Sequence, residues 1–230
     1  MAWLVPLLGA GIALAFSARL FGQYLRRRRE YYGLWGIAML MFAAGSTALF
    51  LGALDGWSTA EFRAYWLFGA VLNVPYLALG ELFLLVRPRW PSWAALVLVL
   101  AATAYATAVV RTAPLDAGAL RDALPLGRDA FGRGTEGLGV ARIFSFTGYF
   151  LLLGGALFSA ITMRGRPELR NRFTGTLLIA LGATVVAGGS AFAAAGNLPG
   201  FSSTITLGVA IMFAGSLRAA RPAEGSSRSR

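Results

Sequence analysis

The polar residues best able to do chemistry inside the apolar part of this sequence lie close together, at positions 72–81. Asn73 and Tyr76 fall on one helical stripe, with Glu81 at its flank. Pro75 removes one helix hydrogen bond, which predicts a kink and a backbone carbonyl open to a solute or an ion. Facing lipid would leave the Asn73 amide unpaired, so we expect this stripe to face the interior of a helical bundle.

Glu81 and Arg19 are the only charged side chains inside the apolar segments. Glu81 precedes Arg87 by six residues and Arg19 precedes Arg26 by seven, so both lie about 9–10 Å from the arginines on one side of the membrane. Equal depth predicts an ion pair between them. The pair is interpreted as a gate or proton-coupled site, or as a structural tie between two helices. Snorkelling to the interface is a further alternative.

Three residue types that dominate enzyme chemistry are absent, namely cysteine, histidine and lysine. Their absence excludes a thiolate nucleophile, a histidine base, the usual haem and zinc ligands, and a Schiff base to retinal or pyridoxal phosphate. Paired carboxylates are also missing within the apolar segments. The sequence predicts no catalytic residue, metal or cofactor, so an intramembrane enzyme is the third choice of function.

The composition indicates a membrane protein in which these residues are positioned by helices. Of the 230 residues, 57% are hydrophobic and 13% charged, with a mean hydropathy of +0.64. We predict an all-α fold with seven membrane spans over 1–217, an outer loop at 111–141 and a disordered cytoplasmic tail at 218–230. The spans are predicted at Trp3–Leu25, Tyr31–Leu54, Tyr65–Val86, Trp93–Val110, Arg142–Met163, Phe173–Asn197 and Ser202–Leu217.

The distribution of charge predicts the orientation of the chain in a plasma membrane. With the N-terminus outside, the inner segments hold fourteen arginines and three glutamates, and the outer segments hold six arginines and six acids. Positive charges in short loops resist translocation, so the first face is predicted to be cytoplasmic. The arginines are also expected to attract anionic lipid headgroups. Because they flank spans, nucleic-acid binding is not predicted.

Two short similarities predict an internal repeat. Residues 13–18 resemble residues 155–160, and residues 44–48 resemble residues 187–191. Spans 1–3 would then correspond to spans 5–7, with span 4 as a linker that gives both halves the same orientation. The alternative is seven helices of similar composition without duplication.

The outer loop and the small residues of the spans have structural interpretations. The loop is interpreted as a flexible connector, with a lid over a cavity as the alternative. Within it, a short helix at 116–123 would turn leucines toward the membrane or the bundle. Glycines in spans 2, 5 and 6 are expected to form packing faces: Gly33, Gly36, Gly45, Gly148, Gly154, Gly155, Gly182, Gly188 and Gly189.

Polar and aromatic side chains of the spans also have structural interpretations. The hydroxyls of Ser46, Thr47, Thr184 and Ser190 are expected to bond their own helices. An interfacial belt is expected from Trp57, Trp66, Trp90 and Trp93.

In architecture, seven spans in a three-one-three arrangement resemble the small sugar and vitamin carriers of the SWEET and PQ-loop type. The Pro-Gln pair of those carriers is absent, as is the retinal lysine of the microbial rhodopsins, which share the span count. Such a resemblance implies a carrier, and no family is assigned. The leading prediction is a small-solute carrier or ligand-binding bundle with Asn73, Tyr76, Glu81 and Arg19 as ligand-binding residues. The alternative is an accessory, sensor or assembly subunit that forms homo- or hetero-oligomers through Gly/Ala faces.

Overall fold

The computed structural model describes residues 4–86, 88–165 and 169–221, and its regular elements in these ranges are all helical. Seven helices there are long and apolar enough to cross a membrane, which confirms the predicted number of spans. Six are single helices, and the third span joins three segments. The elements are α1 (Leu4–Arg27), α2 (Glu30–Asp55), α3 (Thr59–Ala64), η1 (Tyr65–Leu72), α4 (Asn73–Leu85), α5 (Trp90–Thr112), α7 (Glu136–Met163), α8 (Arg170–Ala194) and α9 (Leu198–Ala219).

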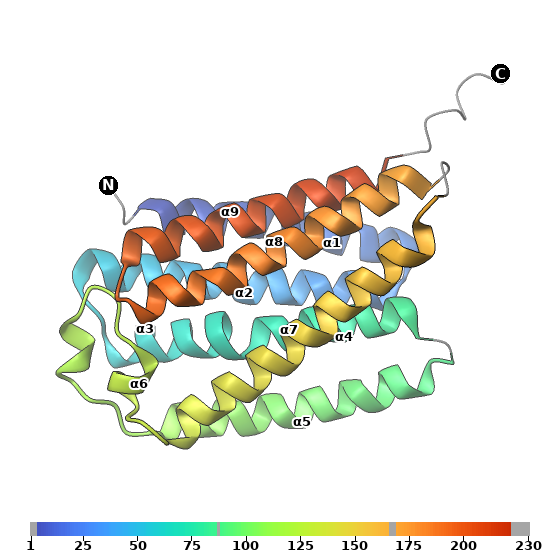
Figure 1. The fold of residues 1–230 in the computed structure, drawn as a ribbon. Helices are drawn as coiled ribbons and strands as arrows, with labels where there is room; N and C mark the ends of the chain where they lie inside the picture. Colours follow the sequence, from blue (N-terminus) through green and yellow to red (C-terminus); the bar gives the residue numbers. More distant parts are fainter. Residues whose placement is uncertain (1–3, 87, 166–168, 222–230) are drawn as a thin grey trace.

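The long helices run side by side and form one bundle (Figure 1). In chain order, α1 packs on α2, α2 on α4, α4 on α7, α7 on α8 and α8 on α9, and α9 closes the set by contacting α1. The helix α5 lies at the edge, where it contacts α4, η1 and α7. A repeat relating the first three spans to the last three stays a prediction.

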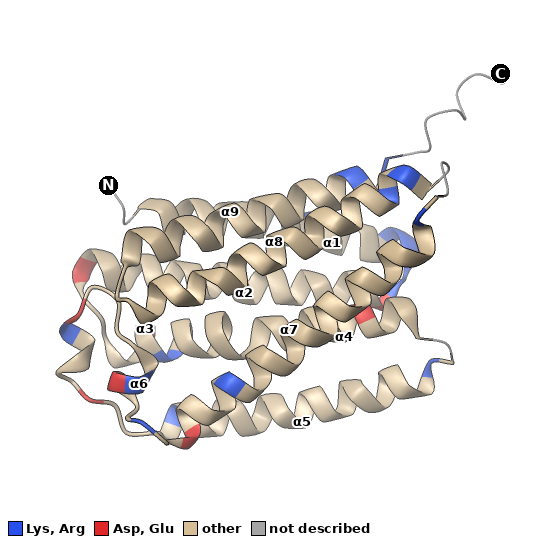
Figure 2. Ribbon diagram, in the orientation of Figure 1, with Lys and Arg blue, Asp and Glu red and all other residues tan. Residues whose placement is uncertain are grey.

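Charge separates the two ends of the bundle (Figure 2). One end, here called the arginine-rich end, carries the α1–α2 turn, the α4–α5 connection, the start of α8 and the end of α9. The opposite end, here called the mixed-charge end, carries basic and acidic residues together. The helix α9 extends to Ala219, and residues 222–230 of the predicted tail lie outside the described residues.

A left-handed residue makes the tight turn between the first two spans. Arg28 has φ +51°, and its amide donates to the Tyr24 carbonyl at 2.8 Å. This geometry ends a helix by satisfying one of its free carbonyls, and glycine is the usual residue there. The turn brings Arg27, the last residue of α1, close to Arg29, the N-cap of α2. Arg27 and Arg29 therefore lie at the same end of the bundle.

Glycines on α8 and α9 let these two backbones touch. A Cβ atom at Gly182 would lie 2.5 Å from the Gly208 carbonyl oxygen, and one at Gly175 would lie 2.6 Å from that of Gly215. Each pair is reciprocal, because a Cβ at Gly208 or Gly215 would meet the partner carbonyl at 2.7 Å. Of the glycines expected to pack, Gly182 confirms the expectation here. It fails at Gly154 and Gly188, which have no neighbour within 4 Å.

The outer segment between α5 and α7 is folded onto the bundle, and its interpretation as a flexible connector, with a lid as the alternative, stays a prediction. It contains the short helices η2 (Ala119–Arg121) and α6 (Gly127–Ala130). The helix predicted at 116–123 is thus reduced to three residues. Leu120, Leu124 and Phe131 are buried, as amphipathic patterning suggests for leucines facing the bundle. Gly127 permits the contact, since a Cβ there would lie 1.9 Å from the Trp66 ring.

The four tryptophans expected in an interfacial belt divide into two pairs. Trp90 and Trp93 are exposed, at 71% and 49%, as a belt requires. Trp57 is only 8% exposed, and its indole N–H donates to the Ala123 carbonyl at 3.3 Å. Trp66 donates to the Gly137 carbonyl at 3.2 Å. Trp57 thus fastens the outer segment to the bundle, and Trp66 joins the third span to α7, because an indole N–H that leaves water needs an acceptor.

Candidate functional site

The third span begins with a capping box and passes through a π-helix. The Ser58 hydroxyl accepts from the Glu61 amide at 3.2 Å, and the Glu61 carboxylate accepts from the Ser58 amide at 2.9 Å. Together these two bonds satisfy free donors at the helix start. The following π-helix, η1, ends directly before Asn73. Segments of this kind are frequent at functional sites.

Ser145 supplies a hydrogen bond to the backbone of the π-helix near Pro75. Pro75 has no N–H and cannot donate to the preceding turn. The Ser145 hydroxyl of α7 donates to the Ala70 carbonyl in that turn. The kink predicted at Pro75, and a carbonyl open to a solute or an ion, stay predictions.

Glycines and one tryptophan hold α4 between α2 and α7. The Trp35 indole of α2 donates to the Leu77 carbonyl at 3.0 Å. Its ring covers Gly80, where a Cβ would lie 2.4 Å from the indole. On the α7 side, a Cβ at Gly155 would lie 2.5 Å from Glu81 Cγ. These close approaches fix the depth and direction of the Glu81 side chain.

Glu81 is buried without a polar partner among the residues that the structure describes. Its exposed fraction is 7%, and it forms no hydrogen bond or ion pair with any described residue. A buried carboxyl group normally has such a partner, because leaving it unpaired costs free energy. Glu81 therefore has unused capacity to bind a hydrogen-bond donor or a cation.

A cavity of about 780 Å³ extends from the arginine-rich end to Glu81. Residues of α1, α2, α4, α7, α8 and α9 line it, so it lies in the centre of the bundle. Its apolar wall includes Phe16, Met39, Leu77, Leu152 and Met212. This volume lies within the range of sites for small organic molecules, which are mostly apolar with a few placed polar groups.

Polar and basic residues make up the rest of the cavity lining. Three guanidinium groups take part, those of Arg27, Arg172 and Arg221. Hydroxyl and amide groups from four helices are added: Gln23, Ser159, Thr162, Asn171, Thr176 and Ser216. Such a lining can bind a solute that carries an acidic group near the arginines and a donor group at Glu81. Among the described residues, no group of three acidic side chains that could hold a metal ion occurs.

The four residues predicted to bind ligand occupy different environments. Glu81 lines the cavity, but Asn73 and Tyr76 are outside its lining. Asn73 is 4% exposed and its Oδ1 has no hydrogen-bond partner in the described part of the chain, whereas the Tyr76 hydroxyl lies 3.3 Å from Thr103 Oγ1 of α5. Arg19 is exposed on α1. The structure does not form the predicted Arg19–Glu81 ion pair, because the guanidinium lies on the outer surface of the bundle.

The sequence reasoning did not identify the polar lining contributed by α7, α8 and α9. Ser159 and Thr162 are three residues apart on α7, a spacing that places two hydroxyls on one helical face. The same signal occurs in many membrane helices, where hydroxyls bond their own backbone. The hydroxyls of Thr47, Thr184 and Ser190 do so here, as expected, whereas Ser46 forms no such bond with a described residue. Thr162 and Ser216 of the cavity lining also donate to their own helices, at the Ser159 and Phe213 carbonyls. Only the packing of the helices therefore places some of these hydroxyls at a cavity.

The fold and the cavity define a class, that of multi-pass helical membrane proteins with seven candidate spans and a central cavity open at one end. No protein family, curated protein or solved structure matches the chain.

Proposed function

We propose that this protein binds a small organic solute in the central cavity and carries it across the membrane, with Glu81 as the principal ligand-binding residue. The observation that supports the proposal is the Glu81 carboxyl group, which is buried, lines a cavity of about 780 Å³ and has no partner among the described residues. The solute would have an apolar body and a hydrogen-bond donor or cationic group that reaches Glu81.

Transport of a solute requires that the cavity open to one side of the membrane at a time. Two features of the structure support this mode of transport. The outer segment and its aromatic contacts cover the mixed-charge end, where Phe131 packs against Phe62 and Trp66. The cavity is lined by residues of the arginine-rich end. We propose that this end faces the cytoplasm of a cell with the protein in its plasma membrane. The structure would then be an inward-open state.

The predicted ligand-binding residues have separate parts in this proposal. Glu81 contacts the solute. Asn73 and Tyr76 lie in the first turn of α4, directly after the π-helix, about 12 Å and 8 Å along the helix from Glu81. They would contact the solute only if the π-helix beside them changed conformation. Arg19 would have no contact with the solute in the inward-open state.

The first experiment compares two glutamine substitutions in the purified protein. A thermal-shift panel of small amines, amino acids and carboxylates identifies a ligand, whose affinity is then measured by calorimetry. Glu81→Gln is expected to weaken binding by at least ten-fold, because it removes the carboxyl group that would bind the solute's donor or cationic group. Glu136→Gln, an exposed carboxylate at the start of α7, is the matched control and should change the affinity less than two-fold.

A second pair of variants tests whether the solute occupies the cavity. Ala156→Phe fills it from a buried position, and Leu157→Phe adds a similar ring at a position 47% exposed on the outside of α7. The first should abolish binding and proteoliposome uptake of the identified solute, and the second should preserve both. Equal binding by both would disprove the proposal and favour the alternative of an accessory or assembly subunit, which would be tested by co-purification.

A further inference from the structure

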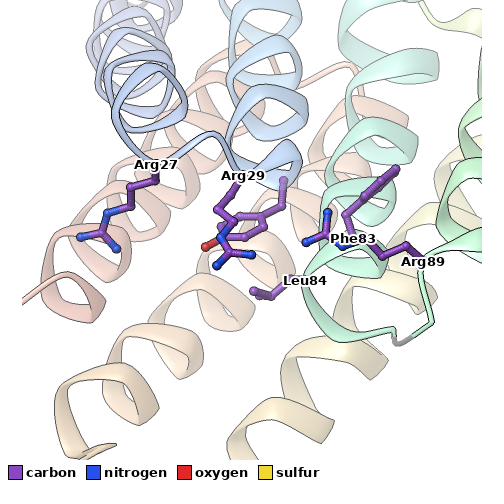
Figure 3. A pocket seen from close by; sticks show the side chains of 6 residues that line it. Arg27, Arg29, Phe83, Leu84 and Arg89 are labelled. Atoms are coloured by element: carbon purple, nitrogen blue, oxygen red, sulfur yellow. The ribbon is translucent and has the colours of Figure 1, made fainter.

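A second pocket lies beside the mouth of the cavity, at the surface of the arginine-rich end (Figure 3). Its volume is about 450 Å³. Three arginines and three apolar or aromatic side chains line it: Arg27, Arg29, Tyr31, Phe83, Leu84 and Arg89. The residues come from the end of α1, the start of α2, the end of α4 and the connection to α5.

The three guanidinium groups are held at this pocket by the local fold. The left-handed turn at Arg28 places Arg27 and Arg29 on either side of the α1–α2 connection. The Arg89 side chain extends back toward the start of α2, where it forms an ion pair with Glu30 at 2.5 Å. Since one acid faces three arginines, the cluster keeps an excess positive charge of two.

The pocket differs from a run of arginines exposed to water on all sides, because apolar side chains form part of its lining. Phe83 is buried at the bottom, and Leu84 is 40% exposed beside it. Trp90 and Trp93 lie nearby in the chain and are exposed, as residues at the headgroup level of a bilayer are. An anion bound by the arginines would thus lie above an apolar surface that acyl chains can contact.

We propose that this pocket is a binding site for a phosphate group, supplied by the headgroup of an anionic phospholipid. Arginine suits this chemistry, because its planar guanidinium group binds phosphate oxygens in pairs and stays charged at all usable pH values. Basic pockets between membrane helices are known to bind such headgroups. The proposal does not depend on the solute proposed above, although Arg27, Tyr31 and Leu84 line both the pocket and the central cavity.

The experiment measures lipid binding to the purified full chain by native mass spectrometry. Phosphatidylglycerol and phosphatidylcholine with identical acyl chains are compared. The wild-type chain should bind the anionic lipid at least ten-fold more tightly. Arg27→Gln with Arg29→Gln should remove most of this preference, with a loss of roughly ten-fold. Arg26→Gln with Arg28→Gln is the matched control. It removes the same charge from the same run, outside the pocket, and should retain the preference within two-fold.

Equal binding of the two lipids by the wild type would overturn the proposal. Equal losses in both double variants would also overturn it, in favour of diffuse attraction between the arginines and anionic lipid. Competition by glycerol phosphate or inorganic phosphate would show that the phosphate group suffices without acyl chains, and lack of competition would show that the lipid is required. Both support a phosphate site. If the first double variant does not fold, Leu84→Trp fills the pocket with all arginines retained. It should weaken binding of the anionic lipid, and unchanged binding would count against the site.

Discussion

At the scale of single residues, several polar side chains satisfy backbone groups that the helices leave free. Arg63 is an example, because its guanidinium group donates to the carbonyls of Val110 and Ala113 at the end of α5, the latter at 2.9 Å. Ser17 likewise donates to the Gly36 carbonyl at 2.8 Å and joins α1 to α2. In an apolar medium each such bond removes the cost of an unpaired carbonyl. These residues stabilise the bundle in places where sequence patterns show only a surface charge or a small hydroxyl.

The Ser145 hydroxyl offers a direct test at this scale. Ser145→Ala should lower the free energy of unfolding by about 1–2 kcal/mol, because the Ala70 carbonyl loses its side-chain donor from α7. Unfolding of the protein in detergent micelles measures the change. Ser190→Ala is the control, since that exposed hydroxyl bonds its own helix at Ala187, and its effect should lie below about 0.5 kcal/mol. Equal stability of both variants would mean that Ser145 does not support the π-helix.

At the scale of helices, close backbone approach organises the bundle. Lipid chains are as apolar as leucine, so burying leucine between helices gives little net gain in a membrane. Close contact between α8 and α9 therefore depends on positions where no side chain intervenes. Gly175 and Gly182 are seven residues apart, as are Gly208 and Gly215 on the antiparallel partner. The two pairs meet at both places. This spacing repeats every two helical turns, so it presents both glycines on one face.

A leucine at one of these positions should separate the two helices. For Gly182→Leu we expect a loss of about 1–3 kcal/mol or more, because the new Cβ would meet backbone atoms of α9 that have no room to move. Thermal unfolding in micelles provides the measurement. Gly188→Leu on the same helix is the comparison, since that glycine has no neighbour within 4 Å, and it should be neutral. A stable Gly182→Leu protein would show that the contact contributes little.

At the scale of the whole molecule, the two ends differ in charge and in closure. The arginine-rich end contains both cavities described above, and the mixed-charge end is covered by a folded segment. Under the proposed orientation, the openings face the cytoplasm. The asymmetry of charge gives this orientation its physical basis, because positive loops are retained on the cytoplasmic side.

The absence of cysteine makes the orientation simple to test, since every introduced thiol is unique. Ala117→Cys in the outer segment and Ala220→Cys after α9 both leave the charge unchanged, and both positions are exposed. In intact cells a membrane-impermeant maleimide should label the first, and it should label the second only after permeabilisation. Labelling of Ala220→Cys in intact cells would reverse the proposed orientation and the inward-open assignment.

The sequence by itself determined the helical class and the number of spans. These follow from composition and from apolar segments of spanning length. The buried position of Glu81 also follows from the cost of exposing a carboxylate to lipid. Only the tertiary structure decided what surrounds it. Arg19 shares the depth of Glu81 along its helix, but depth does not fix the direction in which a side chain points around the helix axis.

Tertiary packing likewise decided the cavity, the outer segment and the second pocket. The cavity lining comes from six helices that are distant in the sequence, and no periodicity within one helix reports the neighbours of another. The outer segment has the glycines of a flexible loop, yet the Trp66 ring packs against its backbone at Gly127, and its own Phe131 packs against α7 at Gly137. The same residue type serves as a flexible link or as a close contact, and the difference lies in whether an aromatic ring from elsewhere in the chain reaches it.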